Sequence, residues 1–146
     1  MNDESPRKES SPKYDLEERL LDYAAAIIQL VDTLPSSLAG RDVAGQLLRS
    51  GTNPLTSHGE SQSAESTKDF IHKLKVGLKE LRESFPWLRL IQRSRLHPNE
   101  AVVCGLMDET DQLIRIFFTS IQTAQKRLAL RERPTSSKQH PEPRLE

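Results

Sequence analysis

Residues 15–34 read DLEERLLDYAAAIIQLVDTL, and this stretch decides the fold. Its apolar residues recur at alternating steps of four and three: Leu20, Ala24, Ile27, Val31 and Leu34. Such spacing places one apolar seam along an α-helix, which Leu21 and Ile28 should widen. Pro35 ends the helix, because the residue before a proline disfavours helical geometry.

Three more segments repeat the helical period, at about 41–63, 67–93 and 98–131. The apolar side of the second contains Ala44, Leu47, Leu48, Gly51 and Leu55. No segment alternates between apolar and polar residues with a period of two, so no strand is expected. Long helices joined by short loops favour antiparallel neighbours. The sequence therefore predicts an all-α protein, an antiparallel up-and-down four-helix bundle.

The helix ends and the prolines carry further expectations. Ser66 should cap the third helix, and Pro98 should occupy the first turn of the fourth. A proline inside a helix removes a hydrogen bond and costs roughly 3 kcal/mol. We therefore expect a kink or a break at Pro54 and a bend at Pro86.

Length and composition set the remaining limits. A chain of 146 residues corresponds to one domain, a bundle over 14–133 between polar tails at 1–13 and 134–146 that are predicted to be disordered. Acidic and basic residues are equal in number, so any affinity for nucleic acid must come from local clustering. Neither a signal peptide nor a membrane span is visible, and the single cysteine allows no internal disulfide. These features indicate a cytoplasmic protein.

No arrangement of residues indicates catalysis. The histidines are His58, His72, His97 and His140, and none pairs with a second His or a Cys at ligand spacing. Cys104 lies in the apolar stretch 102–106 and should be a buried structural residue. We expect no catalytic residue, no cofactor and no metal, so the protein is predicted not to be an enzyme.

The third segment carries a row of positive charge. Its members are Lys68, Lys75, Lys79, Arg82, Arg89 and Arg93. At 100° per residue these cations fall within an arc of roughly 80°, away from the apolar seam. We call them the basic stripe, because such rows bind phosphate backbones. The alternative is an ordinary solvated face balanced by nearby acids. No aromatic residue interleaves the stripe, which argues against base stacking on it.

The fourth segment has more apolar residues than one core needs. Those outside its seam are Val102, Val103, Ile114, Ile116 and Phe118. We therefore predict a homo-oligomer whose interface contains Ile114, Ile116, Phe118 and Trp87. Trp87 lies on a helix flank, where it is either a boundary core residue or an anchor between subunits.

A series of short matches lies between residues 46 and 88: 46–52 (QLLRSGT), Glu60, Asp69-Phe70, Lys73-Leu74, 79–83 (KELRE) and Trp87-Leu88. The resemblance that they carry covers about residues 14–130. The series resembles the four-helix bundle family of proteins encoded by intervening sequences in bacterial 23S ribosomal RNA genes. That family includes the accessory variability determinant of diversity-generating retroelements. The resemblance implies a bundle that assembles into a ring, typically a pentamer, without catalytic residues. For retroelement members it implies a basic surface that engages RNA and a reverse transcriptase.

The chain departs from the family pattern near the end of the second helix. Ser57, His58 and Gly59 stand where the family usually has asparagine, an apolar residue and alanine. Each change should weaken the helix or its packing.

Two functional hypotheses follow. The first is an oligomeric helical scaffold that presents basic helix faces to RNA, DNA or a partner such as a reverse transcriptase. The alternative is a bundle that only self-assembles or binds protein, with no affinity for nucleic acid. Salt-dependent binding of nucleic acid separates the two.

Overall fold

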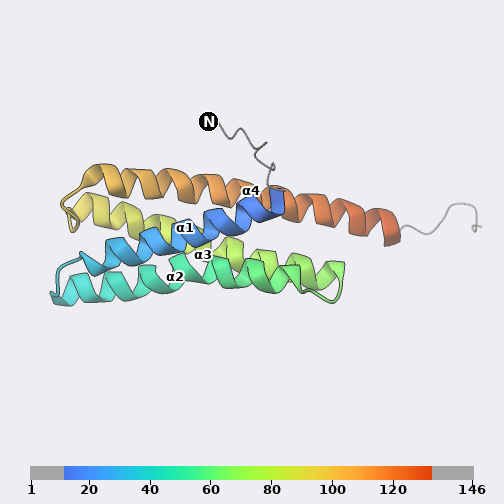
Figure 1. Ribbon diagram of the computed structural model, residues 1–146, viewed down its shortest axis with the longest axis horizontal. Helices are drawn as coiled ribbons and strands as arrows, with labels where there is room; N and C mark the ends of the chain where they lie inside the picture. The colour runs from blue at the N-terminus through green and yellow to red at the C-terminus, as the bar shows by residue number, and fades with distance from the viewer. Residues whose placement is uncertain (1–11, 133–146) are drawn as a thin grey trace, which may run out of the picture.

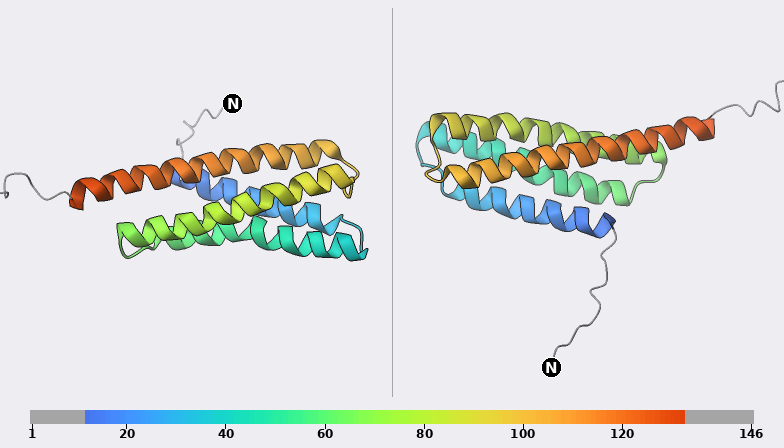
Figure 2. Two further views of the ribbon diagram at one scale, coloured as in Figure 1. Left: turned by 180° about the vertical axis from the view of Figure 1, so that it is seen from behind. Right: turned by 90° about the horizontal axis from the view of Figure 1, so that it is seen from above.

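A computed structural model describes residues 12–132, and every regular element in that range is a helix. The helices are α1 (Pro12–Asp32), α2 (Leu38–Gln62), α3 (Thr67–Ser94) and α4 (Glu100–Glu132). Consecutive helices fold back on one another, and α1 lies beside α4 to close the bundle (Figure 1). The predicted antiparallel up-and-down four-helix bundle is thus confirmed. The last turns of α4 extend beyond the other helices (Figure 2).

The predicted tails lie almost entirely outside the described residues. Only residues 12 and 13 of the first tail fall within the described range, where they belong to α1. That helix begins three residues before the predicted start at Asp15 and ends at Asp32, ahead of Pro35. Within residues 12–132, no helix combines the length and apolarity needed to cross a membrane.

Polar side chains start the other three helices. The Ser37 hydroxyl accepts a hydrogen bond from the Gly40 N–H at 3.1 Å and caps α2. The Ser66 hydroxyl accepts one from the Asp69 N–H at 3.0 Å, as predicted for the third helix. These contacts satisfy N–H groups that have no partner inside the first turn.

The predicted start of the fourth helix at Pro98 is wrong. The helix α4 begins at Glu100, and the Asn99 side-chain oxygen accepts from the Ala101 and Val102 N–H groups at 3.1 and 3.4 Å. Asparagine is a strong capping residue, so Asn99 rather than the proline sets the boundary.

Both internal prolines lie within continuous helices. The helix α2 runs through Pro54 and α3 runs through Pro86, which excludes the break considered for the second helix. Pro54 is fully buried, so its ring contributes to the packed interior. The departure from the family at Ser57 and His58 does not interrupt α2, and both residues are buried.

The buried core contains most of the predicted apolar seam but fewer of the residues that were expected to widen it. Leu20, Ala24, Ile27 and Val31 are buried, as are Leu47, Leu81 and Leu113 of the other three helices. The side chains of Leu21, Ile28, Leu48, Val102 and Phe118 are instead exposed, by 39–49%. Val103, expected outside the seam, is buried. A shift of one residue turns a helical side chain by about 100°, so small angular offsets decide which residues face the core.

Two glycines allow the helices to approach closely. A Cβ atom on Gly77 of α3 would lie 2.6 Å from Phe117 Cε2 of α4. A Cβ atom on Gly51 of α2 would lie 2.8 Å from the Ile27 side chain of α1. Both glycines therefore occupy places where the neighbouring side chain fills the space that a larger residue needs.

One layer of the core is polar and draws a hydroxyl from each helix. We call it the hydroxyl layer; its members are Tyr23, Ser50, Ser84 and Thr110, all at most 2% exposed. The Tyr23 and Thr110 oxygens lie 2.7 Å apart, and the Ser84 hydroxyl donates to that of Ser50 at 2.9 Å. Burial raises the pKa of the Tyr23 hydroxyl, and hydrogen bonds with Thr110 and Ser84 offset part of the rise. Buried hydroxyls are tolerated in this core because each has a partner.

Candidate nucleic-acid interface

The basic stripe faces solvent along α3. Lys68, Lys75, Lys79, Arg82, Arg89 and Arg93 are all exposed. The stripe extends over 26 of the helix's 28 positions, or about 38 Å at 1.5 Å per residue. Six cations on one open face provide a row of attachment points for a phosphate backbone.

Only one member of the stripe is neutralised by an ion pair within the described part of the chain. Lys68 Nζ lies 3.3 Å from Glu132 Oε1 of α4, at the end of the row. The other five cations have no carboxylate within ion-pairing distance among residues 12–132. Their charge is therefore available to an external anion.

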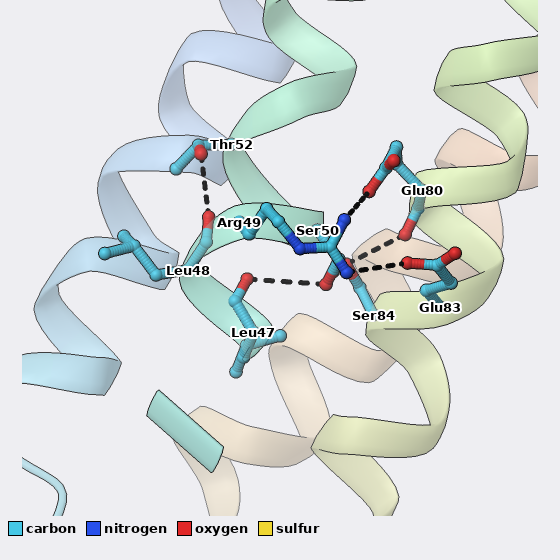
Figure 3. A network of polar contacts seen from close by, with 8 residues as sticks. All are labelled: Leu47, Leu48, Arg49, Ser50, Thr52, Glu80, Glu83 and Ser84. Atoms are coloured by element: carbon cyan, nitrogen blue, oxygen red, sulfur yellow. Dashed lines mark hydrogen bonds and ion pairs between the residues drawn. The ribbon is translucent and has the colours of Figure 1, made fainter. Parts of the chain in front are cut away.

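Two glutamates in the middle of α3, Glu80 and Glu83, form ion pairs with an arginine of α2. Arg49 of α2 reaches across to α3, where its guanidinium nitrogens lie 3.3 Å from Glu80 and 3.2 Å from Glu83 (Figure 3). The Ser50–Ser84 hydrogen bond lies beside this fork (Figure 3). The single positive charge of Arg49 offsets part of the two negative charges, so both carboxylates reduce the field of the stripe less than unpaired acids would.

A groove between α3 and α4 adjoins the centre of the stripe. It has a volume of about 550 Å³ and is lined by Lys75, Leu78, Lys79, Arg82, Glu83, Phe118, Ile121, Gln122 and Gln125. Three of these residues are stripe cations, and Glu83 is the only carboxylate among them. This volume is typical of sites for small organic groups.

Phe118 changes the interpretation of the stripe. Its side chain is 45% exposed and lies in the groove beside Lys75, Lys79 and Arg82. No aromatic residue of α3 interleaves the stripe, but α4 supplies one beside it. Phe118 lies about 40 residues further along the chain, so the sequence of α3 alone does not reveal it.

The four residues predicted at an oligomer interface differ in how far they are buried. Trp87 and Ile114 are half-buried and pack against the core, which accounts for much of their apolar area. Ile116 is half-buried, and Phe118 lies in the groove beside the basic stripe. For Trp87, the contacts agree with the boundary position in the core that the sequence allowed.

Cys104 is exposed, so the expectation of a buried structural cysteine is wrong. Its neighbour Val103 takes the core position, and the Cys104 sulfur accepts a hydrogen bond from Gln92 Nε2 at 3.3 Å. His58 is 2% exposed and its ring packs against Phe117, with centroids 6.4 Å apart. No group of three His, Cys, Asp or Glu residues in the described range is placed to hold a metal ion.

These features define a class: an antiparallel four-helix bundle with an exposed cationic helix face. No family model matches the chain, and no curated protein matches it. Among solved structures, it is similar to a protein with unknown function from the S23 ribosomal protein family of Bacteroides thetaiotaomicron VPI-5482. The identity is 25% and the TM-score is 0.69, over 75% of this chain and 97% of that one.

The likeness supports the part of the resemblance that concerns the ribosomal intervening-sequence proteins. It agrees with the four-helix architecture over nearly the whole length of the neighbour. No comparison links the chain to the retroelement variability determinant.

Proposed function

We propose that the protein is a non-enzymatic helical scaffold that binds nucleic acid through the basic stripe of α3. The observation that carries this proposal is the set of five exposed cations without a carboxylate partner in the described residues. A solvated face in a chain of zero net charge is usually balanced by its neighbours. Here the nearest acids, Glu80 and Glu83, are already engaged by Arg49.

The chemistry of the stripe favours contacts with phosphates. Lysine and arginine on a regular helix face can follow a backbone without reading its sequence. We therefore expect binding that weakens steeply with salt and varies little with base sequence. A partner protein such as a reverse transcriptase would join this assembly as a further component, as the family resemblance suggests.

The test is charge reversal in the stripe. Lys75→Glu, Lys79→Glu and Arg82→Glu together should weaken binding of both RNA and duplex DNA. They should also flatten the log–log dependence of affinity on salt by about one unit per lost contact. A matched control reverses Arg41, Arg115 and Lys126, which are exposed cations outside the stripe, and changes net charge equally.

The control separates a local site from a general effect of charge. Equal losses in both triple variants would contradict a site on α3. If the wild-type protein binds neither RNA nor duplex DNA at low salt, the stripe is a solvated face, and the protein-only scaffold replaces this proposal. Circular dichroism of each variant establishes that the helices persist.

A specific observation favours self-association as a second property. Leu21 and Ile28, seven residues apart on α1, expose 49% and 45% of their surface. Leu48 of the neighbouring α2 is 39% exposed. Apolar side chains grouped on an outer face commonly mark a protein interface. We propose that a second copy of the chain covers this face, and a pentamer is favoured by the resemblance alone.

A further inference from the structure

We propose that the groove between α3 and α4 binds a single unpaired base of a nucleic-acid strand, stacked on Phe118, while Lys75, Lys79 and Arg82 hold the flanking phosphates. This inference rests on the proposed function and deepens it. It identifies single-stranded nucleic acid as the ligand, whereas the cations of the basic stripe alone would suit any phosphate backbone.

The composition of the groove carries the argument. Phe118 is exposed by 45%, although its neighbour Phe117 is completely buried in the core. An aromatic ring beside a cationic groove is the combination found where proteins bind single strands, because every base presents a flat face. In a duplex the base faces are already stacked on one another, so Phe118 is useful only to an unpaired base.

The remaining lining residues suit the same ligand. Leu78 and Ile121, both buried, form the apolar floor, and the exposed amides of Gln122 and Gln125 lie along the α4 side. Amide groups donate and accept hydrogen bonds, so they can meet a base edge of any type. Apolar lining with a few polar groups is typical of a site that holds a flat organic group.

Charge disfavours a two-fold contact between copies of the chain at this groove. A two-fold contact between identical copies would place each set of cations opposite itself. Lys75, Lys79 and Arg82 would then repel their counterparts at short range. Glu83 cannot balance all three, since it already lies 3.2 Å from Arg49.

The experiment compares single strands with a duplex of the same length. The probes are fluorescein-labelled oligouridine and oligothymidine of roughly 12 nucleotides, within the common footprint of about 4–16, and a duplex DNA of that length. Phe118→Leu keeps an apolar side chain but removes the ring, and it should weaken single-strand binding about tenfold or more. Its effect on duplex binding should be less than twofold. Phe118→Trp, which retains a stacking surface, should preserve single-strand binding.

Stacking of a base on Phe118 can be detected by fluorescence, separately from the binding affinity. An oligonucleotide carrying 2-aminopurine loses fluorescence when the base stacks, so quenching should occur with the wild type and with Phe118→Trp but not with Phe118→Leu. Val102→Ala, another exposed apolar position on α4, controls for general loss of surface and should change nothing. Tighter binding of oligouridine than of oligothymidine would identify RNA as the source, through contacts to the 2′-hydroxyl.

The outcomes separate this inference from the proposed function. If Phe118→Leu leaves single-strand binding intact while the triple charge reversal weakens it, the stacking site is overturned and the basic stripe stands. If no probe binds at low salt, both fail. If Phe118→Leu lowers the oligomeric mass in light scattering, a second copy covers the groove and the inference is overturned.

Discussion

The Tyr23 hydroxyl of α1 donates its hydrogen to the Thr110 hydroxyl of α4 across 2.7 Å of buried core. The direction follows from Thr110, whose single hydrogen is directed to the Leu106 carbonyl oxygen at 2.6 Å. The contact joins the first and last helices of the bundle, between residues 87 positions apart. This hydrogen bond is important for holding α1 against α4, because α1 packs less extensively against α4 than against α2. The salt bridge from Arg19 to Glu109, at 2.8 Å, reinforces the same seam.

The two partners of this pair should not contribute independently to stability. Tyr23→Phe loses one hydrogen bond, about 0.5–1.5 kcal/mol. Thr110→Val leaves the buried tyrosine without its acceptor and should cost about 1–3 kcal/mol. The double variant should be less destabilised than the sum of the two, with a coupling of about 0.5–3 kcal/mol. Urea unfolding of the four proteins measures this cycle, and strict additivity would contradict the contact.

The same tyrosine should make stability depend on alkaline pH. Burial raises the pKa of Tyr23 above its ordinary value of 10.0, so the folded state holds the phenolic proton more tightly than the unfolded state. Its stabilising effect is complete below pH 10.0 and is lost as the pH rises through the raised value. The measured quantity is the difference in unfolding free energy between wild type and Tyr23→Phe, which isolates the contribution of Tyr23. That difference should shift in favour of Tyr23→Phe above pH 10.0, and a constant difference would argue against a buried tyrosine.

Two glycine substitutions should act in opposite directions. A Cβ atom on Gly59 of α2 would meet no neighbouring atom within 4 Å, so Gly59→Ala should stabilise the helix by about 0.5–1 kcal/mol. Gly77→Ala gains the same helical propensity, but its Cβ would meet the Phe117 ring at 2.6 Å. Overpacking of a core costs about 1–3 kcal/mol. Thermal melts of both variants measure the contrast, and Gly45→Ala, also in open space, serves as a second control.

The fold could be predicted because the apolar period of each segment is a local property. Positions such as Leu20, Ile27 and Val31 repeat closely enough that their burial follows from helix geometry alone. The ends of the helices are harder to predict than their interiors. Asn99 suits a helix cap and Pro98 suits a first helical turn, and only the hydrogen bonds that Asn99 accepts show which residue sets the start of α4.

The site could be predicted only in part. The basic stripe lies on a single helix, so its spacing alone placed its cations on one solvent-facing side. Phe118 was predicted at a subunit interface rather than beside the stripe, and the contact of Thr110 was not predicted, because both depend on how α4 is aligned against α3 and α1. Cys104 was misplaced for a simpler reason: its neighbour Val103 lies about 100° around the helix and takes the core position.

The exposed cysteine gives a direct test of the rotation of α4. Cys104 should react with a thiol reagent in the folded protein at a rate close to that of the unfolded chain. Cys104→Ser should change the unfolding free energy by less than about 0.5 kcal/mol, as is usual for exposed positions. Protection of the thiol from the reagent, in a sample shown to be monomeric, would place Cys104 in the core and require a different rotation of α4.

The last prediction concerns which face joins copies of the chain. Light scattering at tens of micromolar should give a mass above the 16.6 kDa of one chain. Leu21→Glu with Ile28→Glu should lower that mass, because both side chains are exposed on α1 and would place charge in an apolar contact. The monomer should stay folded, since neither residue belongs to the buried core.

An interface on α1 and α2 and an interface at the groove between α3 and α4 predict different effects of Phe118→Leu on the oligomeric mass. If the contact lies on α1 and α2, Phe118→Leu leaves the mass unchanged, because its groove between α3 and α4 remains open to nucleic acid. A mass that responds to Phe118→Leu but not to the α1 variants would move the interface to the basic stripe. A wild-type mass of 16.6 kDa would remove self-association altogether, since a monomer at these concentrations leaves the apolar face of α1 uncovered.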